Sequence, residues 1–122
     1  MHSAARLYKT VSEKISSPRS TEADLLLDAA IRLMRIQDNW ESKDVRDLDD
    51  ALRYNRMLWT ILLSAVTKAD NPLPQAIRQN VANLGLFVMK HTIAILVEPK
   101  PEKISLLINI NRNLAAGLAG TA

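Results

Sequence analysis

The stretch ALRYNRMLWTILL, residues 51 to 63, lies at the centre of the chain and carries its clearest helical pattern. Apolar residues recur there at spacings of three and four, which is the period of one face of an α-helix. Extended in both directions, the stripe consists of Val45, Leu48, Leu52, Asn55, Trp59, Leu62 and Val66. The stripe predicts a long amphipathic helix, and its one polar member, Asn55, requires an explanation.

A second asparagine interrupts a second apolar stripe near the end of the chain. That stripe consists of Ile104, Ile108, Asn111, Ala115 and Leu118. A buried amide costs several kcal/mol unless it is hydrogen-bonded. In a structural interpretation, which we favour, Asn55 and Asn111 pair with each other or with a helix terminus and fix the register of the helices. In a functional interpretation, one of them lines a groove and binds the backbone of a partner.

The composition is that of a small helical domain. A single domain is expected for 122 residues, and a chain of this size buries roughly two-thirds of its unfolded surface. Hydrophobic residues make up 48% of the chain and aromatic residues 4%, so the core must be aliphatic. Three glycines and five prolines are few for an all-β protein. The chain has no cysteine, which excludes disulfides, iron–sulfur clusters, thiolate zinc sites and cysteine nucleophiles.

The charge and the hydropathy of the chain limit the partners and the cellular environment that can be expected for it. The net charge is +3, but residues 21–53 carry nine acids against five bases, unlike the basic face of a dedicated nucleic-acid binder. Charged residues interrupt any signal-like apolar run after Met1. The longest uncharged stretches, 57–67 and 79–89, are shorter than the roughly 20 residues of a membrane helix. We therefore expect a cytoplasmic protein without membrane insertion.

The order of apolar stripes and helix breakers predicts an all-α fold, an antiparallel bundle of about five helices. The expected segments are residues 4–15, residues 20–36 capped by Ser20 or Thr21, a third helix capped by Ser42, and residues 73–97 and 102–118. Pro18 separates the first segment from the rest. Two alternatives are open for residues 1–19 within the single domain of residues 1–122: exchange between protomers, or folding on binding.

The helix expected over residues 73–97 is apolar on two faces. One stripe consists of Ile77, Val81, Leu84, Val88, His91 and Ile95. The other consists of Ala82, Leu86, Met89, Ile93 and Leu96. A helix that is apolar on two sides is either central in a bundle or offers one side to a partner.

Catalytic and metal-binding patterns are not found in the sequence. The acids Asp44, Asp47, Asp49 and Asp50 are best explained as complements to a helix N-terminus. Trp59 is expected in the core, Trp40 in a loop, and His91 as a hydrogen-bonded core histidine. No nucleophile accompanies a base and an orienting group, and no phosphate-binding loop or zinc spacing occurs. We expect a protein that is not an enzyme and has no cofactor or metal.

Five motifs in order carry a resemblance to a known family. They are SPRSTEADLL (17–26), NRMLW (55–59), NPLPQAIR (71–78), GLFVMKHT (85–92) and INRNLAAGL (110–118). Together they resemble the FlaF family of flagellar biosynthesis regulatory proteins over essentially the whole chain. The matching positions are Pro18, Arg19, Thr21, Glu22, Asn55, Arg56, Leu58, Trp59, Leu73, Pro74, Arg78, His91, Thr92, Asn111 and Arg112. Met57 departs from the pattern, where relatives are expected to carry a basic residue.

The resemblance implies a cytoplasmic, non-enzymatic protein that is needed for normal flagellin production and acts alongside a second regulator, FlbT. It further implies that the protein binds unassembled flagellin as an export chaperone. We expect the amphipathic terminal helices of flagellin to bind an apolar groove, and a monomer or homodimer to do so. The candidate partner-binding residues are Leu86, Met89, Ile93, Asn55, Arg56, Asn111 and Arg112.

An alternative is that the protein is a post-transcriptional regulator that binds flagellin mRNA. Its candidate residues are Arg6, Lys9, Lys14 and Arg19. The few aromatic residues argue against stacking on bases, and no RNA-binding module is recognisable. A structural part of the flagellar basal body is a third class, for which polymerisation is expected. The sequence favours the protein-binding hypothesis.

Overall fold

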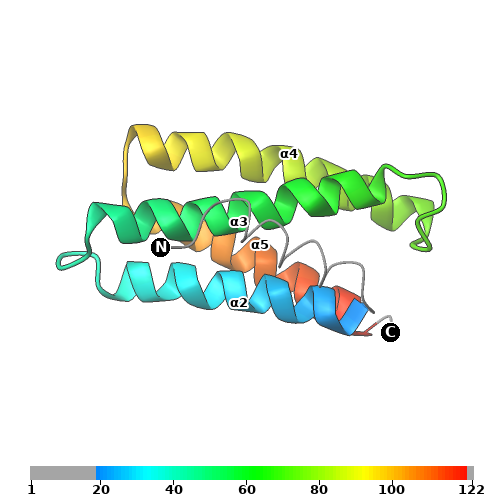
Figure 1. Cartoon of the computed structure of the whole chain (residues 1–122), viewed down its shortest axis with the longest axis horizontal. Coiled ribbons are helices and arrows are strands. Elements are labelled where there is room, and N and C mark those ends of the chain that lie inside the picture. The colour runs from blue at the N-terminus through cyan, green and yellow to red at the C-terminus, as the bar shows by residue number, and fades with distance from the viewer. Residues whose placement is uncertain (1–18, 121–122) are drawn as a thin grey trace.

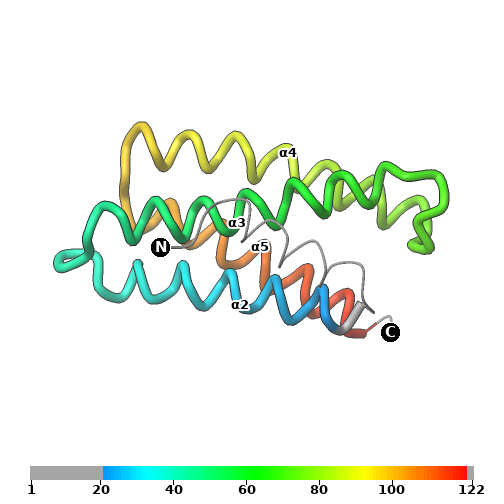
Figure 2. Tube along the Cα trace, in the orientation of Figure 1, coloured from blue at the N-terminus to red at the C-terminus, as the bar shows by residue number. Residues whose placement is uncertain are grey.

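A computed structural model describes residues 19–120 of the chain. Within this range lie four helices: α2 (Arg19–Asp38), α3 (Val45–Val66), α4 (Gln75–Val97) and α5 (Pro101–Gly120). Successive helices run in opposite directions and are joined by short connections (Figure 1). The tube in Figure 2 shows the same up-and-down path. The predicted all-α antiparallel bundle is therefore confirmed, and the first expected helix, residues 4–15, lies outside the described residues.

The four helices form a ring in the order α2, α3, α4, α5. Helix α2 packs most extensively against α5 and also against α3, and α3 packs against α4. Helices α4 and α5 meet least, and Figure 1 shows them diverging from the connection that joins them. Diagonal pairs make no comparable contact among the described helices. Because α4 packs least extensively against its two neighbours among the described helices, part of its surface is left uncovered.

The starts of α2 and α3 differ from those expected. Helix α2 begins at Arg19, so Ser20 and Thr21 lie inside it and do not cap it. Helix α3 is capped by Asp44 and not by Ser42, because the Asp44 carboxylate accepts from the backbone N of Arg46 at 2.9 Å. The Ser42 hydroxyl instead donates to the carbonyl of Asn39 at 3.3 Å.

The core is formed by the predicted stripe of α3 and by matching stripes of the other helices. Of the residues expected on the α3 stripe, Leu48, Leu52, Asn55, Trp59, Leu62 and Val66 are buried. Val45 is exposed, because it is the first residue of α3 and lies at the end of the bundle. Apart from Trp59 and Tyr54, the buried hydrophobic residues are aliphatic, as the composition predicted.

Polar contacts close the connections between helices. The Gln37 amide donates to the Pro101 carbonyl at 2.9 Å and to the Ser105 hydroxyl at 2.7 Å, which joins α2 to the start of α5. Asn71 donates to the carbonyl of Ala65 and accepts from the backbone N of Leu73, both at 3.0 Å. These contacts fix where α3 ends and where the chain turns into α4.

Candidate functional site

Helix α4 is positioned by its two ends and by one buried stripe. Pro74 precedes the helix with φ −54°, and the helix ends at Val97 before Glu98 and Pro99. Proline suits a helix start and prevents a helix from continuing. Val81, Gly85, Val88, Thr92 and Ile95 form the buried stripe. At Gly85 the side chain of Leu63 lies so close that a Cβ atom would meet it at 2.5 Å, so glycine allows α3 and α4 to approach.

An exposed apolar surface runs along α4 beside the buried stripe. Leu86 and Ile93 are each 62% exposed, Leu96 is 45% exposed, and Met89 is partly buried against the core. We call Leu86, Met89, Ile93 and Leu96 the outer face of α4. Its spacing of three, four and three residues forms one stripe along the helix. Leu86, Met89 and Ile93 thus lie on one side of α4, and their role in partner binding stays a prediction.

Helix α4 is strongly apolar, and yet much of it is exposed. Among the described residues, it is the one helix whose length and composition would allow it to cross a membrane, a property that the core helix of a soluble bundle can share. Only 28% of its most apolar window is buried in the structure. A core helix would bury most of such a window, so the apolar surplus of α4 is on the surface.

Cations border the outer face of α4. Helix α4 contains no Asp or Glu, and Lys90 is exposed on it. On α3, Arg53 and Arg56 are exposed and line a depression of about 220 Å³. The other lining residues of this depression are Asp49, Leu52, Thr92 and Leu96. Arg56 therefore lies beside the outer face. Arg53 and Lys90 were not singled out in the sequence, because Arg53 lies outside the five motifs and Lys90 is not one of the matching positions within the motif of residues 85–92.

Asn55 and Asn111 lie inside the bundle and not on its surface. Both are 0% exposed, and Asn111 Nδ2 donates to Asn55 Oδ1 at 2.6 Å. Asn111 Oδ1 accepts from the indole N–H of Trp59 at 2.9 Å. The structural interpretation is therefore the one that the geometry supports. The expectation that either amide lines an open groove is not met, because neither amide has accessible surface.

Two further candidate residues, His91 and Arg112, do not belong to the outer face of α4. His91 is half-buried, its Nε2 lies 2.6 Å from the Lys103 carbonyl, and its ring stacks on Phe87 with centroids 5.4 Å apart. An imidazole N–H that donates to this carbonyl joins α4 to α5. Arg112 is exposed on α5 and does not line the depression formed by α3 and α4. The geometry assigns Arg112 no role.

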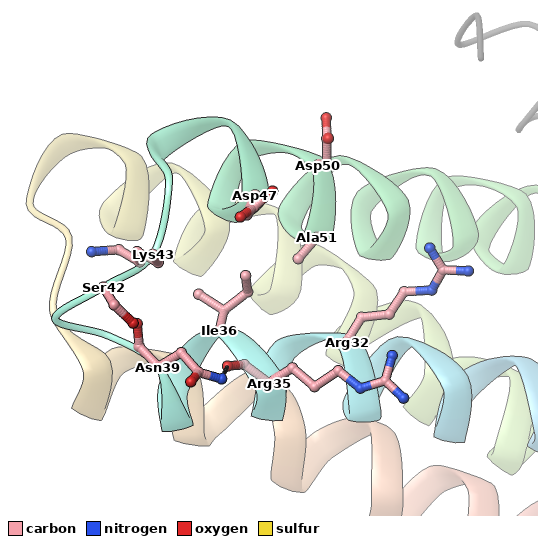
Figure 3. Close-up of a pocket in the computed structure, with 9 residues that line it drawn as sticks. All are labelled: Arg32, Arg35, Ile36, Asn39, Ser42, Lys43, Asp47, Asp50 and Ala51. Atoms are coloured by element: carbon pink, nitrogen blue, oxygen red, sulfur yellow. Dashed lines mark hydrogen bonds between the residues drawn. The ribbon is translucent and has the colours of Figure 1, made fainter. Parts of the chain in front are cut away.

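A larger depression of about 500 Å³ lies between α2 and α3 near their connection. Figure 3 shows Arg32 and Arg35 on α2 and Asp47 and Asp50 on α3 at its walls. The guanidinium of Arg32 is held 3.2 Å from the Asp28 carboxylate. The walls of this depression carry charges of both signs and its opening is wide. Its charges therefore do not indicate one class of ligand.

Tyr54 and Asp28 form a partly buried hydrogen bond between α3 and α2. The Tyr54 hydroxyl donates to the Asp28 carboxylate at 2.9 Å, and the Arg32 guanidinium lies 4.0 Å from the centroid of the Tyr54 ring. Burial of the phenol, its hydrogen bond to Asp28 and the charge of Asp28 together raise the pKa of Tyr54 to about 12. The neutral phenol is therefore the form that the fold accommodates.

The remaining candidates bear on metal and RNA binding. Within residues 19–120, no group of three His, Cys, Asp or Glu residues is placed to hold a metal ion. Asp44 caps α3, and its hydrogen bond from the Arg46 backbone lowers the pKa of the Asp44 carboxyl. Arg6, Lys9 and Lys14 lie outside the described residues, and Arg19 is the first residue of α2. The basic strip of the RNA-binding alternative therefore stays a prediction.

These features define a class of protein. It is a small helical bundle with one exposed apolar helix face bordered by cations and with a hydrogen-bonded pair of asparagines buried in its core. The family model described as Flagellar protein FlaF matches residues 4–118 of the chain. The chain therefore belongs to the FlaF family of flagellar proteins, and the resemblance noted in the sequence is confirmed. Searches among curated proteins and among solved structures gave no match.

Proposed function

We propose that this flagellar protein binds unassembled flagellin in the cytoplasm as an export chaperone, without catalytic activity. The outer face of α4 would take the amphipathic terminal helices of flagellin. The observation that supports this proposal is the surplus apolar surface of α4, with Leu86 and Ile93 each 62% exposed on a helix whose other side is packed in the core. Exposed apolar patches on soluble proteins commonly mark interaction sites.

The shape and chemistry of the outer face suit a helical guest. An amphipathic helix recognises a partner through side chains at spacings of three and four residues, and the outer face offers the same spacing. Met89 adds an adaptable side chain, since methionine fills irregular gaps. Leu86 and Ile93 provide branched aliphatic surface on either side of Met89 along the helix. A guest helix on this face would remain shielded from aggregation before export.

We also propose that the protein contributes to the control of flagellin production together with FlbT. Binding of free flagellin would link the amount of unassembled flagellin to this control. In this scheme the protein carries no catalytic group. Its half-buried histidine supports this view, because Nε2 of His91 is already bonded to the Lys103 carbonyl.

The test is calorimetry of the whole chain against its cognate flagellin, whole and with the terminal helices removed. Saturable micromolar or tighter binding that disappears on truncation is expected. Leu86→Glu with Ile93→Glu should weaken binding at least tenfold, because two charges would enter the apolar contact. The matched control is Leu27→Glu with Ile31→Glu, at two exposed apolar positions of α2. It should bind normally.

The same variants must remain folded for this result to be interpreted. Both positions on α4 are mostly exposed, so charge there should change the free energy of unfolding by no more than about 0.5 kcal/mol. Denaturant unfolding followed by circular dichroism measures this change. Unfolding of the Leu86→Glu and Ile93→Glu variant would show that the face belongs to the core. Wild-type affinity in a folded variant would refute the outer face as the binding site.

A further inference from the structure

We propose that the outer face of α4 selects an amphipathic helix whose polar edges carry carboxylates. This inference rests on the proposed function and specifies the chemistry of the partner. Helix α4 is 23 residues long and contains no acidic residue. Its two charged residues are Arg78 and Lys90, and Arg78 donates to the Lys68 carbonyl at 3.0 Å near the start of the helix. Lys90 is the cation of α4 that lies at the level of the outer face.

The second border of the outer face is formed by α3. Arg53 and Arg56 are three residues apart, and both are exposed. Together with Leu96 of the outer face, they line the depression of about 220 Å³. Apolar residues thus lie between a pair of guanidinium groups on one side and an ammonium group on the other. This arrangement complements a helix that is apolar in the middle and acidic along its edges.

These cations are available to a partner. Within residues 19–120, the ion pairs are Arg32–Asp28, Arg46–Asp44 and Lys100–Glu98. Arg53, Arg56 and Lys90 therefore form no ion pair in the part of the chain that the structure describes. Guanidinium groups bind carboxylates through paired hydrogen bonds, and two of them three residues apart fit carboxylates on successive turns of a helix. The length of the outer face, about ten residues or 15 Å, corresponds to about three turns of the guest.

An anionic membrane surface is the competing occupant, since basic and apolar groups also bind acidic lipids. The distribution of acids on α3 argues against it. Asp49 is exposed and lines the same depression as Arg53 and Arg56. A wide anionic surface in contact with the arginines would also approach this carboxylate. A single helix, about 10 Å across, can lie along α4 without covering it.

The experiment uses two synthetic amphipathic peptides with the same leucine and isoleucine face, one with glutamate edges and one with lysine edges. Binding of each fluorescent peptide to the full-length protein is measured by anisotropy at low and high salt. The glutamate peptide should bind at least tenfold more tightly at low salt. The preference should shrink as salt rises, because these exposed charges are screened.

Charge reversal on α3 makes the result specific. Arg53→Glu with Arg56→Glu should abolish or invert the preference for the glutamate peptide. The matched control, Arg35→Glu with Lys68→Glu, changes the net charge equally at two exposed positions that do not line this depression, and the preference should persist. Equal binding of both peptides to the wild type would overturn the inference. A preference that survives Arg53→Glu with Arg56→Glu would also overturn it.

Two further arms separate this inference from its alternatives. Vesicles of anionic or neutral lipid are sedimented with the protein, and binding to anionic vesicles that is lost in Arg53→Glu with Arg56→Glu would assign the surface to a membrane and overturn the inference. Flagellin itself is titrated in parallel. Flagellin binding that requires Leu86 and Ile93 but is indifferent to Arg53 and Arg56 would refute the acidic-edge inference and leave the proposed function standing.

Discussion

Asn111 is the centre of the buried polar contacts, and Asn55 is one of its partners. Asn111 donates to Asn55 Oδ1 at 2.6 Å and to the Leu26 carbonyl at 3.4 Å, and it accepts from the Trp59 indole at 2.9 Å. Asn55 Nδ2 is buried without a hydrogen-bond partner among the described residues. The two asparagine side chains therefore make unequal numbers of hydrogen bonds in the core, although the sequence places them in equivalent apolar stripes.

Asn111→Ala should destabilise the protein more than Asn55→Ala. Removal of Asn111 leaves the Trp59 N–H and the Asn55 amide unsatisfied in the core, at a cost of about 3 kcal/mol. Removal of Asn55 takes away one bond of Asn111 and also removes an unpaired donor, at a cost of about 1–2 kcal/mol. Denaturant unfolding followed by circular dichroism measures both values. The reverse order would contradict the central place of Asn111.

Alkaline pH should destabilise the fold through Tyr54. The pKa of Tyr54 is raised to about 12 in the folded state, while an unfolded tyrosine titrates near 10. The folded state thus holds the phenol proton over a range in which the unfolded state has lost it. The resulting stability is fully present below pH 10 and is lost as the pH rises from about 10 to about 12.

A shift of about two pKa units corresponds to about 3 kcal/mol, and solvent screening at the half-exposed Asp28 carboxylate reduces this to about 2 kcal/mol of stability. Unfolding midpoints of the wild type and of Tyr54→Phe are compared at pH 9 and pH 11. The wild type should lose more stability than the variant over this interval, because phenylalanine does not titrate. Parallel losses in the two proteins would assign the effect to other groups, such as lysines.

Two Gly→Ala substitutions should change the stability of the fold in opposite directions. Gly85→Ala gains helix propensity of up to about 1 kcal/mol but forces Leu63 to move, since a Cβ atom would lie 2.5 Å from its side chain. Overpacking of this kind costs about 1–3 kcal/mol, so a net loss is expected. Gly117→Ala places its Cβ in open space and should gain stability. Thermal unfolding of both variants checks the signs, and a gain at Gly85 would show that Leu63 has room to turn aside.

The start of α3 should depend on Asp44 and not on Ser42. The Asp44 carboxylate accepts from the backbone N of Arg46, whereas the Ser42 hydroxyl bonds to Asn39. Asp44→Ala should lower the unfolding midpoint and Ser42→Ala should leave it nearly unchanged. The pKa of Asp44 is lowered in the fold, so the contribution of the cap is present above the ordinary pKa of an aspartate and is lost as the pH falls through the folded value. Equal effects of the two substitutions would contradict the assignment of the cap.

Periodicity predicted the parts of the fold that depend on one helix at a time. The stripe around Asn55 and Trp59 is buried as expected, because a regular apolar face has one way to avoid water. The choice of cap was wrong because Ser42 and Asp44 both belong to the cap-forming residue types and stand two positions apart. Local sequence does not determine which of the two meets the first free N–H of the helix.

The candidate site depends on how helices are arranged around α4, which the sequence predicts less well. Two apolar stripes were visible on this helix, and the structure determines that Leu86 and Ile93 are on the exposed one. Arg53 and Lys90 come from different helices and share no motif. Their common border with the outer face arises only when α3 and α4 pack, so no pattern along the chain could have indicated it.

The chain contains two tryptophans, and their surroundings differ sharply. Trp59 is fully buried with its N–H bonded to Asn111, while Trp40 is partly exposed with the Lys43 ammonium 3.7 Å from its ring. A Trp40→Phe variant would leave Trp59 as the single tryptophan, in hydrogen-bond contact with Asn111 in the core. Its emission would report directly on the integrity of the interior, independently of helix content, and would distinguish a guest that docks on the surface from one that opens the bundle.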